Sequence, residues 1–323
     1  MFRRSFCSAL LLGVPWIARA QNTAGDWPSK AVRVVVPYAP GGTADTLGRL
    51  ASQHLQGAFK QPFAVENKGG GGGTIGSGQV AKAAPDGYNL VVSGIGSHVI
   101  APVDIKAFDP MADFTHIALL GGPPTVLVIN AAEPPRDLKA FIAYAKASKD
   151  GLSWGSPGQG THGHLIGELF NRQAKIPHTH VSYKGAAPAV ADLLGGQIPA
   201  AFVTLTSANA FIKAGKIRAL AITSAARRSD LADVPTFAEQ GYPELVATTW
   251  FSLSGPPGMP PALVEKINKE VRAGLKTEAM QKQLALEAIE TQDLDAAAFT
   301  RYMRSEIDRW TPLVKSVDKP KAT

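Results

Sequence analysis

The chain has 323 residues, a formal net charge of +7 at pH 7 and a single cysteine. This length can bury a sizeable core, most simply in two domains. The sequence contains no run of five like charges and no basic stripe interleaved with aromatic residues, which argues against a nucleic-acid partner.

The first twenty residues have the pattern of an export signal. Arg3 and Arg4 make a basic start, an apolar stretch follows at 10–17, and Ala18-Arg19-Ala20 has the small-x-small form of a cleavage site. The apolar stretch is too short to span a bilayer, which needs roughly 20 residues. We therefore expect cleavage after Ala20, with Sec and twin-arginine export both open.

The cysteine lies inside this leader, at Cys7, so the exported chain is expected to contain none. Disulfides, a thiolate nucleophile and a cysteine-based metal site are then excluded, and the fold must be stabilised by its core alone.

Short apolar runs alternate with helical patterns along the rest of the chain. Strands are predicted at 32–37, 63–66, 88–93, 114–120, 125–130, 152–154, 178–182, 200–204, 217–223, 246–253 and 288–291. Helices are predicted at 43–58, 74–83, 137–147, 162–173, 186–194, 206–214, 261–275, 277–286 and 295–311. This alternation predicts an α/β fold with mostly parallel sheets and helices on both faces.

Two segments rich in glycine and proline, 121–124 and 255–258, lie beside the apolar runs 125–130 and 246–253. We interpret these runs as strands that cross between two lobes. Lobe 1 is predicted to comprise residues 21–122 and 254–323, and lobe 2 residues 123–253.

The stretch VVVPYAPGGTAD at 34–45 is typical of an anion site. A β-branched run stops at Pro37, crosses Gly41 and Gly42, and enters a helix for which Thr43 is a good N-cap. Free amides of a first helical turn favour an anion, and glycine lets the anion approach the backbone closely. The loop has neither the lysine of a Walker loop nor three spaced glycines, so a carboxylate fits better than a pyrophosphate, with a ligand-free turn as the alternative.

Two further glycine loops with hydroxyl side chains follow predicted strands, at 93–98 and 155–161. The carboxyl ends of strands are where open α/β sheets bind ligands. We expect the first two loops on one lobe and the third on the other.

Two patterns suggest chemistry that their context does not favour. Residues 151–155 match the G-x-S-x-G elbow, but Ser153 lies within a predicted strand and not on a sharp turn, so we interpret it as a strand residue. Four histidines lie close together in the sequence: His162, His164, His178 and His180. The pair His178 and His180 has i, i+2 spacing on one face of a strand and could form half of a metal site. Glu168 is the nearest carboxylate, and polar contacts near an interlobe cleft are the favoured alternative.

Six segments resemble the Bug/TctC family of periplasmic receptors of tripartite tricarboxylate transporters: WPSKAVRVVVPYAPGGTAD (27–45), VENKGGGGGTIG (65–76), AKAAPDGYNLVV (81–92), VSYKGAAPAVADLLGGQI (181–198), IKAGKIRALAITSAARR (212–228) and DVPTFAEQGYPE (233–244). The resemblance covers essentially the whole exported chain. It implies a periplasmic location and a two-lobed flytrap fold that closes on a small carboxylate, with no catalysis, no cofactor and no bound metal. Permease subunits in the membrane are the implied partners of a monomeric receptor.

The resemblance also implies where the ligand contacts lie. Its ligand loops correspond to residues 38–43, 93–97 and 155–161, and its Tyr-Lys-Gly segment corresponds to 183–185. The expected ligand-binding residues are Tyr38, Gly41, Gly42, Thr43, Ser93, Ser97, Ser156, Gly158, Thr161, Tyr183, Lys184, Gly185 and Thr204.

One departure from the family bears on the ligand. Val203 stands where relatives commonly carry an aspartate, and a buried ligand ammonium would need such a carboxylate. We therefore expect an aliphatic or aromatic acid without an amine, with Phe202, Trp250 and Phe251 as either apolar cleft surface or core. An exported α/β enzyme acting on a small acid and a ligand-presenting sensor subunit are the alternatives.

Overall fold

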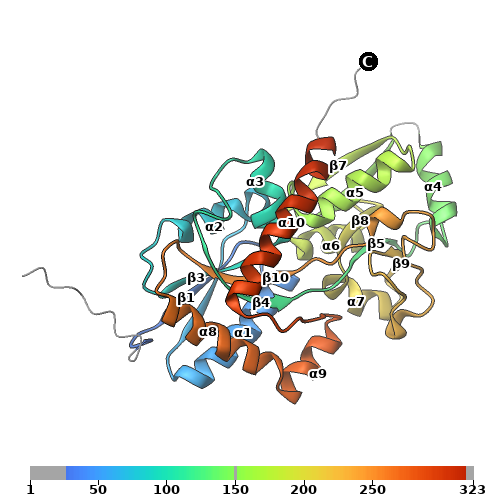
Figure 1. Ribbon diagram of the computed structural model, residues 1–323. Coiled ribbons are helices and arrows are strands. Elements are labelled where there is room, and N and C mark those ends of the chain that lie inside the picture. Colours follow the sequence, from blue (N-terminus) through green and yellow to red (C-terminus); the bar gives the residue numbers. More distant parts are fainter. Residues whose placement is uncertain (1–26, 149–150, 318–323) are drawn as a thin grey trace, which may run out of the picture.

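The chain folds into two α/β lobes, seen in the computed structural model (Figure 1), which describes residues 27–148 and 151–317. The expected leader and its cleavage site lie outside these residues. Each lobe is built on one five-stranded sheet. No helix in the described ranges is long and apolar enough to cross a membrane.

The sheet of lobe 1 has the strand order β2-β1-β3-β10-β4. Its strands are β1 (Val32–Val36), β2 (Phe63–Asn67), β3 (Asn89–Gly94), β4 (Thr115–Gly121) and β10 (Phe251–Gly255). The pairs made by β1 are parallel, whereas β10 runs antiparallel to both of its neighbours.

The sheet of lobe 2 has the order β7-β6-β8-β5-β9. Its strands are β5 (Thr125–Asn130), β6 (Leu152–Ser156), β7 (His178–Ser182), β8 (Ala200–Thr204) and β9 (Ile217–Ile222). Here β5 is the strand that runs antiparallel to its neighbours. The expected α/β fold is thus confirmed, with mixed sheets, because one strand that enters from the other lobe reverses direction in each.

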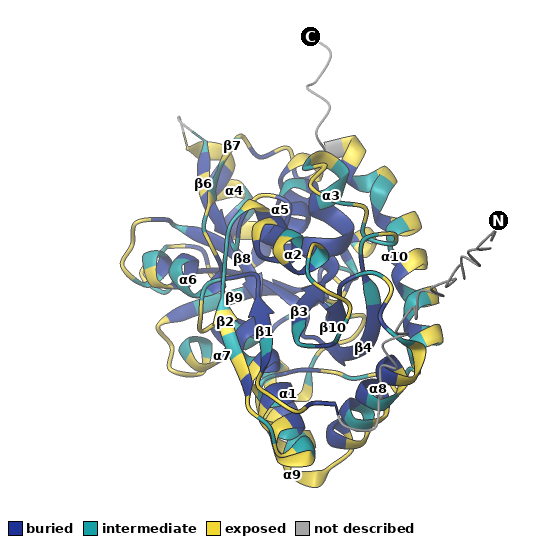
Figure 2. Cartoon of the chain, turned by 90° about the vertical axis from the view of Figure 1, so that its left-hand side faces the viewer, coloured by how far each residue is buried: buried dark blue, intermediate teal, exposed yellow. Residues whose placement is uncertain are grey.

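Helices cover both faces of the sheets, and the strands are buried between them (Figure 2). They are α1 (Thr43–Phe59), α2 (Thr74–Ala81), α3 (Ala101–Asp104), α4 (Leu138–Ala147), α5 (His162–Gln173), α6 (Ala186–Leu194), α7 (Leu205–Lys213), α8 (Pro261–Leu275), α9 (Glu278–Leu286) and α10 (Ala296–Val317), with a π-helix, η2, at Ile95–Ile100.

Alternation along β1 sets the two faces of lobe 1. Val34 and Val36 pack into the cluster that includes residues of α1 and α8, whereas Val35 packs against Val80 of α2 on the other face. The long helix α10 joins the lobes, because its apolar face lies in one cluster with η2 of lobe 1 and α5 of lobe 2.

The lobes are connected by three segments, at 122–124, 248–250 and 288–290, which cross in close main-chain contact. Gly122 pairs with Glu290 in an isolated bridge, and Pro124 pairs with Thr248 in another. A Cβ on Gly122 would lie 1.8 Å from the Thr249 carbonyl oxygen, so only glycine fits at this crossing. We call these crossing segments the hinge.

Two predicted strands are wrong at the hinge. Of the predicted strand 246–253 only residues 251–253 lie in a strand, β10, and 288–291 makes a single bridge. Both segments have apolar patterns, but a segment that passes between sheets lacks the neighbouring strand that a ladder requires. Ala288 also has a φ of 58°, which interrupts an extended run.

Candidate binding cleft

A small cavity of about 40 Å³ lies between the lobes. It is lined by Tyr38, Gly42, Thr43, Ala44, Gly96, Pro157, Thr161, His162, Gly163, Ala186, Thr204, Thr249 and Phe251. Among these lining residues there is no carboxylate, lysine or arginine. The cavity is mostly apolar, and its polar groups are hydroxyls, the His162 imidazole and main-chain atoms.

Four helices begin at this cavity. Residues at or beside the N-termini of α1, α5, α6 and α7 all line it. Each N-terminus carries amides without intrahelical partners and the positive end of a helix dipole. Their convergence favours a negative charge without a basic side chain.

The start of α1 is left open to the cavity. Gly41 has a φ of 85°, which turns the chain, and Gly42 is an N-cap whose side chain offers no capping oxygen. The amides of the first turn are therefore not covered by a side chain, and Gly42, Thr43 and Ala44 lie against the cavity. The expected role of Thr43 as the N-cap is wrong, since Gly42 is the N-cap and Thr43 is the first residue of the helix.

The Asp45 side chain stabilises this turn through hydrogen bonds. Its carboxylate accepts hydrogen bonds from the Gly41 amide (3.0 Å), from Arg49 Nε (3.0 Å) and from Asn67 Nδ2 (2.9 Å). Burial favours the neutral acid, but these three donors outweigh burial and lower the pKa of Asp45. The carboxylate thus stays charged and fixes the glycine turn.

The three helix starts of lobe 2 differ in their caps. Thr161 caps α5 by accepting a hydrogen bond from the His164 amide. The N-caps of α6 and α7 are Gly185 and Thr204, and neither makes a side-chain capping bond. First-turn amides of α6 and α7 are thus also uncapped by side chains next to the cavity.

The two lobes are in direct contact across the cavity. The Thr43 hydroxyl donates to Thr204 Oγ1 at 2.8 Å, and the Ala39 amide donates to the Lys184 carbonyl oxygen at 2.8 Å. A Cβ on Gly185 would lie 3.1 Å from the Ala39 amide nitrogen. The structure is therefore a closed arrangement in which loops of both lobes touch.

Tyr38 and Phe251 form an aromatic wall of the cavity, with ring centroids 6.5 Å apart in an edge-to-face arrangement. The Tyr38 hydroxyl donates to the Gly72 carbonyl oxygen, and burial raises the pKa of this phenol. Phe251 therefore lies on the cleft, whereas Phe202 and Trp250 do not line this cavity and pack in a buried cluster.

His162 lies where the cavity meets the hinge. Its Nδ1 is 3.1 Å from Thr125 Oγ1 and 2.6 Å from Thr249 Oγ1. Burial, with a smaller effect of the Arg309 charge, lowers the pKa of His162 to about 3. The imidazole is therefore neutral at physiological pH and ties together residues from both connecting segments.

The structure divides the expected ligand-binding residues into three groups. The first group lines the cavity: Tyr38, Gly42, Thr43, Thr161 and Thr204. The second group supports the loops through main-chain or hydroxyl contacts: Gly41, Ser97, Ser156, Gly158, Lys184 and Gly185.

The third group, Ser93 and Tyr183, lies away from the cavity. Ser93 is buried in lobe 1, where it contacts the hydroxyls of Ser252 and Ser254 at 2.7 and 2.6 Å. Tyr183 donates from its hydroxyl to Asp192, and its ring packs over Gly155. The expected glycine loop 93–98 is also wrong, because Ser93 lies within β3, which ends at Gly94, and η2 begins at Ile95.

Several lining residues were absent from the expected set, above all Ala44, Gly163, Ala186 and Thr249. Three of these are first-turn residues of helices. The signal was available, since each helix start follows a predicted strand, but the sequence does not say which starts converge. Val203 does not line the cavity either, because its side chain packs in the core of lobe 2.

The other three histidines of the sequence cluster, His164, His178 and His180, lie around Trp154 on the β7 side of lobe 2. His178 Nε2 is 3.1 Å from Glu168, and this contact raises the pKa of His178. Within the described residues, no group of three or more His, Cys, Asp or Glu side chains could hold a metal ion. Ser153 lies inside β6, with α5 starting only at His162, so no nucleophile elbow forms.

The comparisons with known proteins agree with this architecture. BugT of Bordetella pertussis is 33% identical over 300 residues, covering 92% of each chain. An R. palustris protein solved with adipate superposes with a TM-score of 0.86 at 32% identity, covering 90% of this chain and 98% of that one. MatC from Rhodopseudomonas palustris, solved with bound malate, superposes with a TM-score of 0.85 at 32% identity, covering 89% of this chain and 100% of that one.

The family model described as the tripartite tricarboxylate transporter family receptor, TctC, matches residues 47–318. This is a family of solute-binding receptors and not of enzymes, and its members include periplasmic binding proteins such as BugD. The match extends over both lobes and the hinge. The chain therefore belongs to the TctC receptor family of tripartite tricarboxylate transporters.

Proposed function

We propose that this protein captures a small acid with one or two carboxylates and no amine in the periplasm. The observation that carries the proposal is the convergence of four helix N-termini on a cavity that no carboxylate lines. Such a site stabilises a carboxylate through main-chain amides and leaves an ammonium without a charged partner. The adipate and malate held by two relatives are acids of this class.

The ligand carboxylate would lie against the first turn of α1, at Gly42, Thr43 and Ala44. Thr161 and Thr204 would contact it from lobe 2. A cavity of about 40 Å³ has room for about three water-sized spheres, which is less than a dicarboxylate needs. Capture therefore requires the lobes to move apart and close again around the acid.

Calorimetry on unfolded, ligand-stripped and refolded protein tests the ligand class. The panel comprises adipate, malate and benzoate, the amino acids glutamate and aspartate, and adipamide as the uncharged match to adipate. We expect an amine-free acid to bind at micromolar concentration or tighter, with adipamide inactive. Comparable or tighter binding of an amino acid, with no affinity for any amine-free acid, would contradict the proposal.

Delivery to permease subunits of a tripartite transporter is the second half of the proposal, and it rests on family membership. Uptake of the radiolabelled acid should fall when the gene for this receptor is deleted, and return with the wild-type chain. Unchanged uptake, with a transcriptional response to the acid that requires the chain, would favour the sensor alternative instead.

A further inference from the structure

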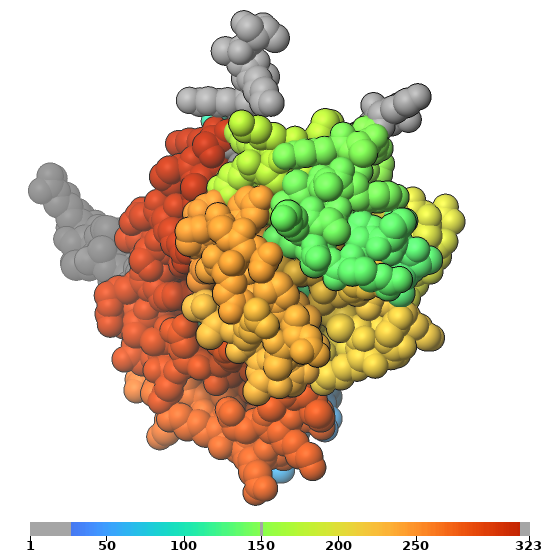
Figure 3. Space-filling view, turned by 90° about the vertical axis from the view of Figure 1, so that its right-hand side faces the viewer, coloured from blue at the N-terminus to red at the C-terminus, as the bar shows by residue number. Residues whose placement is uncertain are grey.

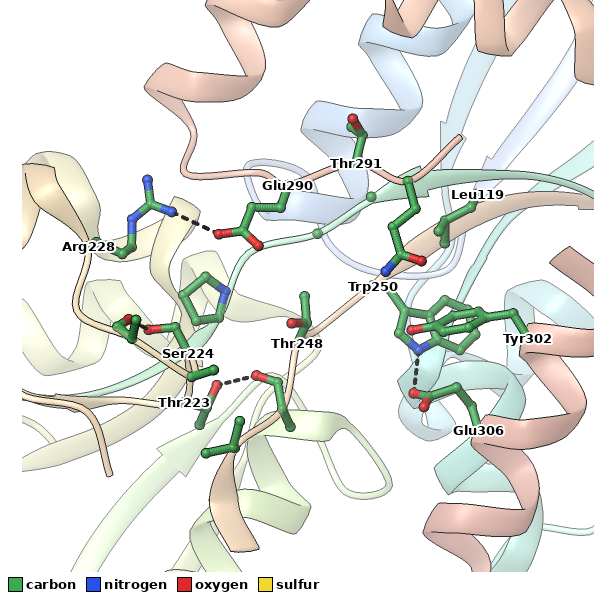
Figure 4. A pocket seen from close by; sticks show the side chains of 18 of the residues that line it. Leu119, Thr223, Ser224, Arg228, Thr248, Trp250, Glu290, Thr291, Tyr302 and Glu306 are labelled. Atoms are coloured by element: carbon green, nitrogen blue, oxygen red, sulfur yellow. Dashed lines mark hydrogen bonds and ion pairs between the residues drawn. The ribbon is translucent and has the colours of Figure 1, made fainter. Parts of the chain in front are cut away.

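A second pocket, of about 680 Å³, lies behind the hinge, away from the cleft (Figure 4). Its walls come from both lobes: the loop 223–229 and residues 246–248 on one side, and 290–292 and α10 on the other. Figure 3 shows the surface where the segment near 225–250 meets the C-terminal helix. The pocket is in the size range of sites for small metabolites, which is about 300–1,000 Å³.

The hinge segment 248–251 separates this pocket from the cleft. Thr249 and Phe251 line the cleft cavity, whereas Thr248 and Trp250 line the pocket behind it. Successive side chains of an extended segment point to opposite sides, so the two pockets share this segment as a wall. The rear pocket is therefore a separate site and not an extension of the cleft.

Arginines outnumber carboxylates among the residues that line the rear pocket. Arg227, Arg228 and Arg309 line it, with the carboxylates Glu290 and Glu306. Arg227 is paired with Glu239 at 2.9 Å, and Arg309 lies 3.8 Å from Glu306. The Glu306 carboxylate is already committed, because Oε2 accepts from the indole nitrogens of Trp250 (2.8 Å) and Trp310 (3.1 Å).

Arg228 is the best placed of these arginines to meet a ligand. Its Nε donates to Asp230 at 2.9 Å, whereas its Nη1 is 3.6 Å from Glu290, whose side chain is 71% exposed at the rim. A guanidinium has five N–H donors in a fixed fork, so further donors remain for a carboxylate or phosphate.

The opposite end of the pocket is aromatic. Trp250 and Tyr302 lie with ring centroids 5.6 Å apart, and Figure 4 shows them across the pocket from Arg228 and Glu290. An anionic group at the arginine end would thus place an attached ring or aliphatic chain beside these side chains.

We infer that the pocket behind the hinge is a second ligand site, which takes a small molecule with a phosphate or carboxylate group joined to a flat apolar part. Arg228 binds the anion, and Trp250 and Tyr302 contact the apolar part. This site is independent of the acid captured in the cleft.

Titration calorimetry with phenyl phosphate in phosphate-free buffer tests the site, with inorganic phosphate and phenol, each titrated separately, as the two halves of the probe. We expect saturable binding of phenyl phosphate in the millimolar range or tighter, and weaker binding of either half. Arg228→Gln should weaken binding about tenfold, because a charge-assisted hydrogen bond is lost, and Arg228→Lys should restore part of it.

Arg33→Gln is the matched control, since Arg33 is a paired surface arginine on β1, far from the hinge in sequence and absent from this pocket. Its Kd for phenyl phosphate should equal that of the wild type. No saturable binding, equal binding by the Arg228→Gln variant, or equal binding of phenol would each overturn the inference. If phenyl phosphate binds in the cleft instead, the Arg228→Gln variant should bind it as tightly as the wild type does.

Discussion

Thr204→Val tests whether the contact across the cleft stabilises the closed form. In the closed form the Thr43 hydroxyl donates to Thr204 Oγ1 at 2.8 Å, and both residues are buried. Valine has the same shape but cannot accept this bond. The substitution therefore removes the bond across the cleft, which leaves the buried Thr43 hydroxyl without this partner, and also removes the 3.0 Å contact between Thr204 Oγ1 and Ser207 Oγ within lobe 2.

The expected magnitude follows from the loss of the bond across the cleft. A hydrogen bond contributes about 1 kcal/mol, and an unsatisfied buried donor adds a cost of about 1–2 kcal/mol. In the open form water solvates both hydroxyls, so the cost falls on the closed form alone. Affinity for the cleft acid should then drop about tenfold or more, since ligand binding requires closure and the Thr204 hydroxyl is also proposed to contact the acid.

The assay is calorimetry with the acid that binds the wild type best. Thr179→Val is the control, because it makes the same chemical change on the exposed surface of β7 in lobe 2. We expect the control to bind like the wild type. A Kd for Thr204→Val within about twofold of the wild-type value would refute the reasoning.

Three other outcomes are expected. Gly42→Pro should abolish acid binding, because proline removes an amide at the start of α1 and fixes φ; calorimetry with retained affinity would remove this turn from the site. Gly122→Ala should lower the free energy of unfolding by several kcal/mol, since its Cβ would lie 1.8 Å from the Thr249 carbonyl oxygen; urea unfolding with an unchanged midpoint would contradict this. Because the pKa of His162 is lowered to about 3, its contribution to stability is present above about pH 6.5 and is lost as the pH falls from there toward 3. Urea unfolding between pH 7 and 5 should therefore show a shallower pH dependence for His162→Gln than for the wild type, by up to about 1.4 kcal/mol per pH unit, and equal slopes would argue that the imidazole takes up a proton in the fold.

Local patterns predicted the regular elements well. The bounds of β5, β7, β8, α5, α6 and α8 match those expected from the sequence, because apolar periodicity and helix caps are local properties. The hinge was harder, since the apolar run 246–253 resembles a strand throughout. Whether it pairs depends on which sheet lies beside it, and that is a property of the fold.

The site was predictable in kind and less so in detail. The glycine turn at Gly41 and Gly42 indicated an anion site, and the structure places it beside the cavity. Ser93 does not line the cavity, because sheet register places its hydroxyl against those of Ser252 and Ser254. Ala186 carries no chemical signal at all, and it lines the cavity only because α6 starts there.

A crystal structure of the complex with the acid selected by calorimetry tests the central claim most directly. The account predicts one ligand carboxylate within hydrogen-bond distance of main-chain amides in the first turn of α1, with Thr161 or Thr204 of lobe 2 contacting the same molecule. An acid bound outside this cleft, or held there by arginine or lysine side chains without contact to these amides, would contradict it.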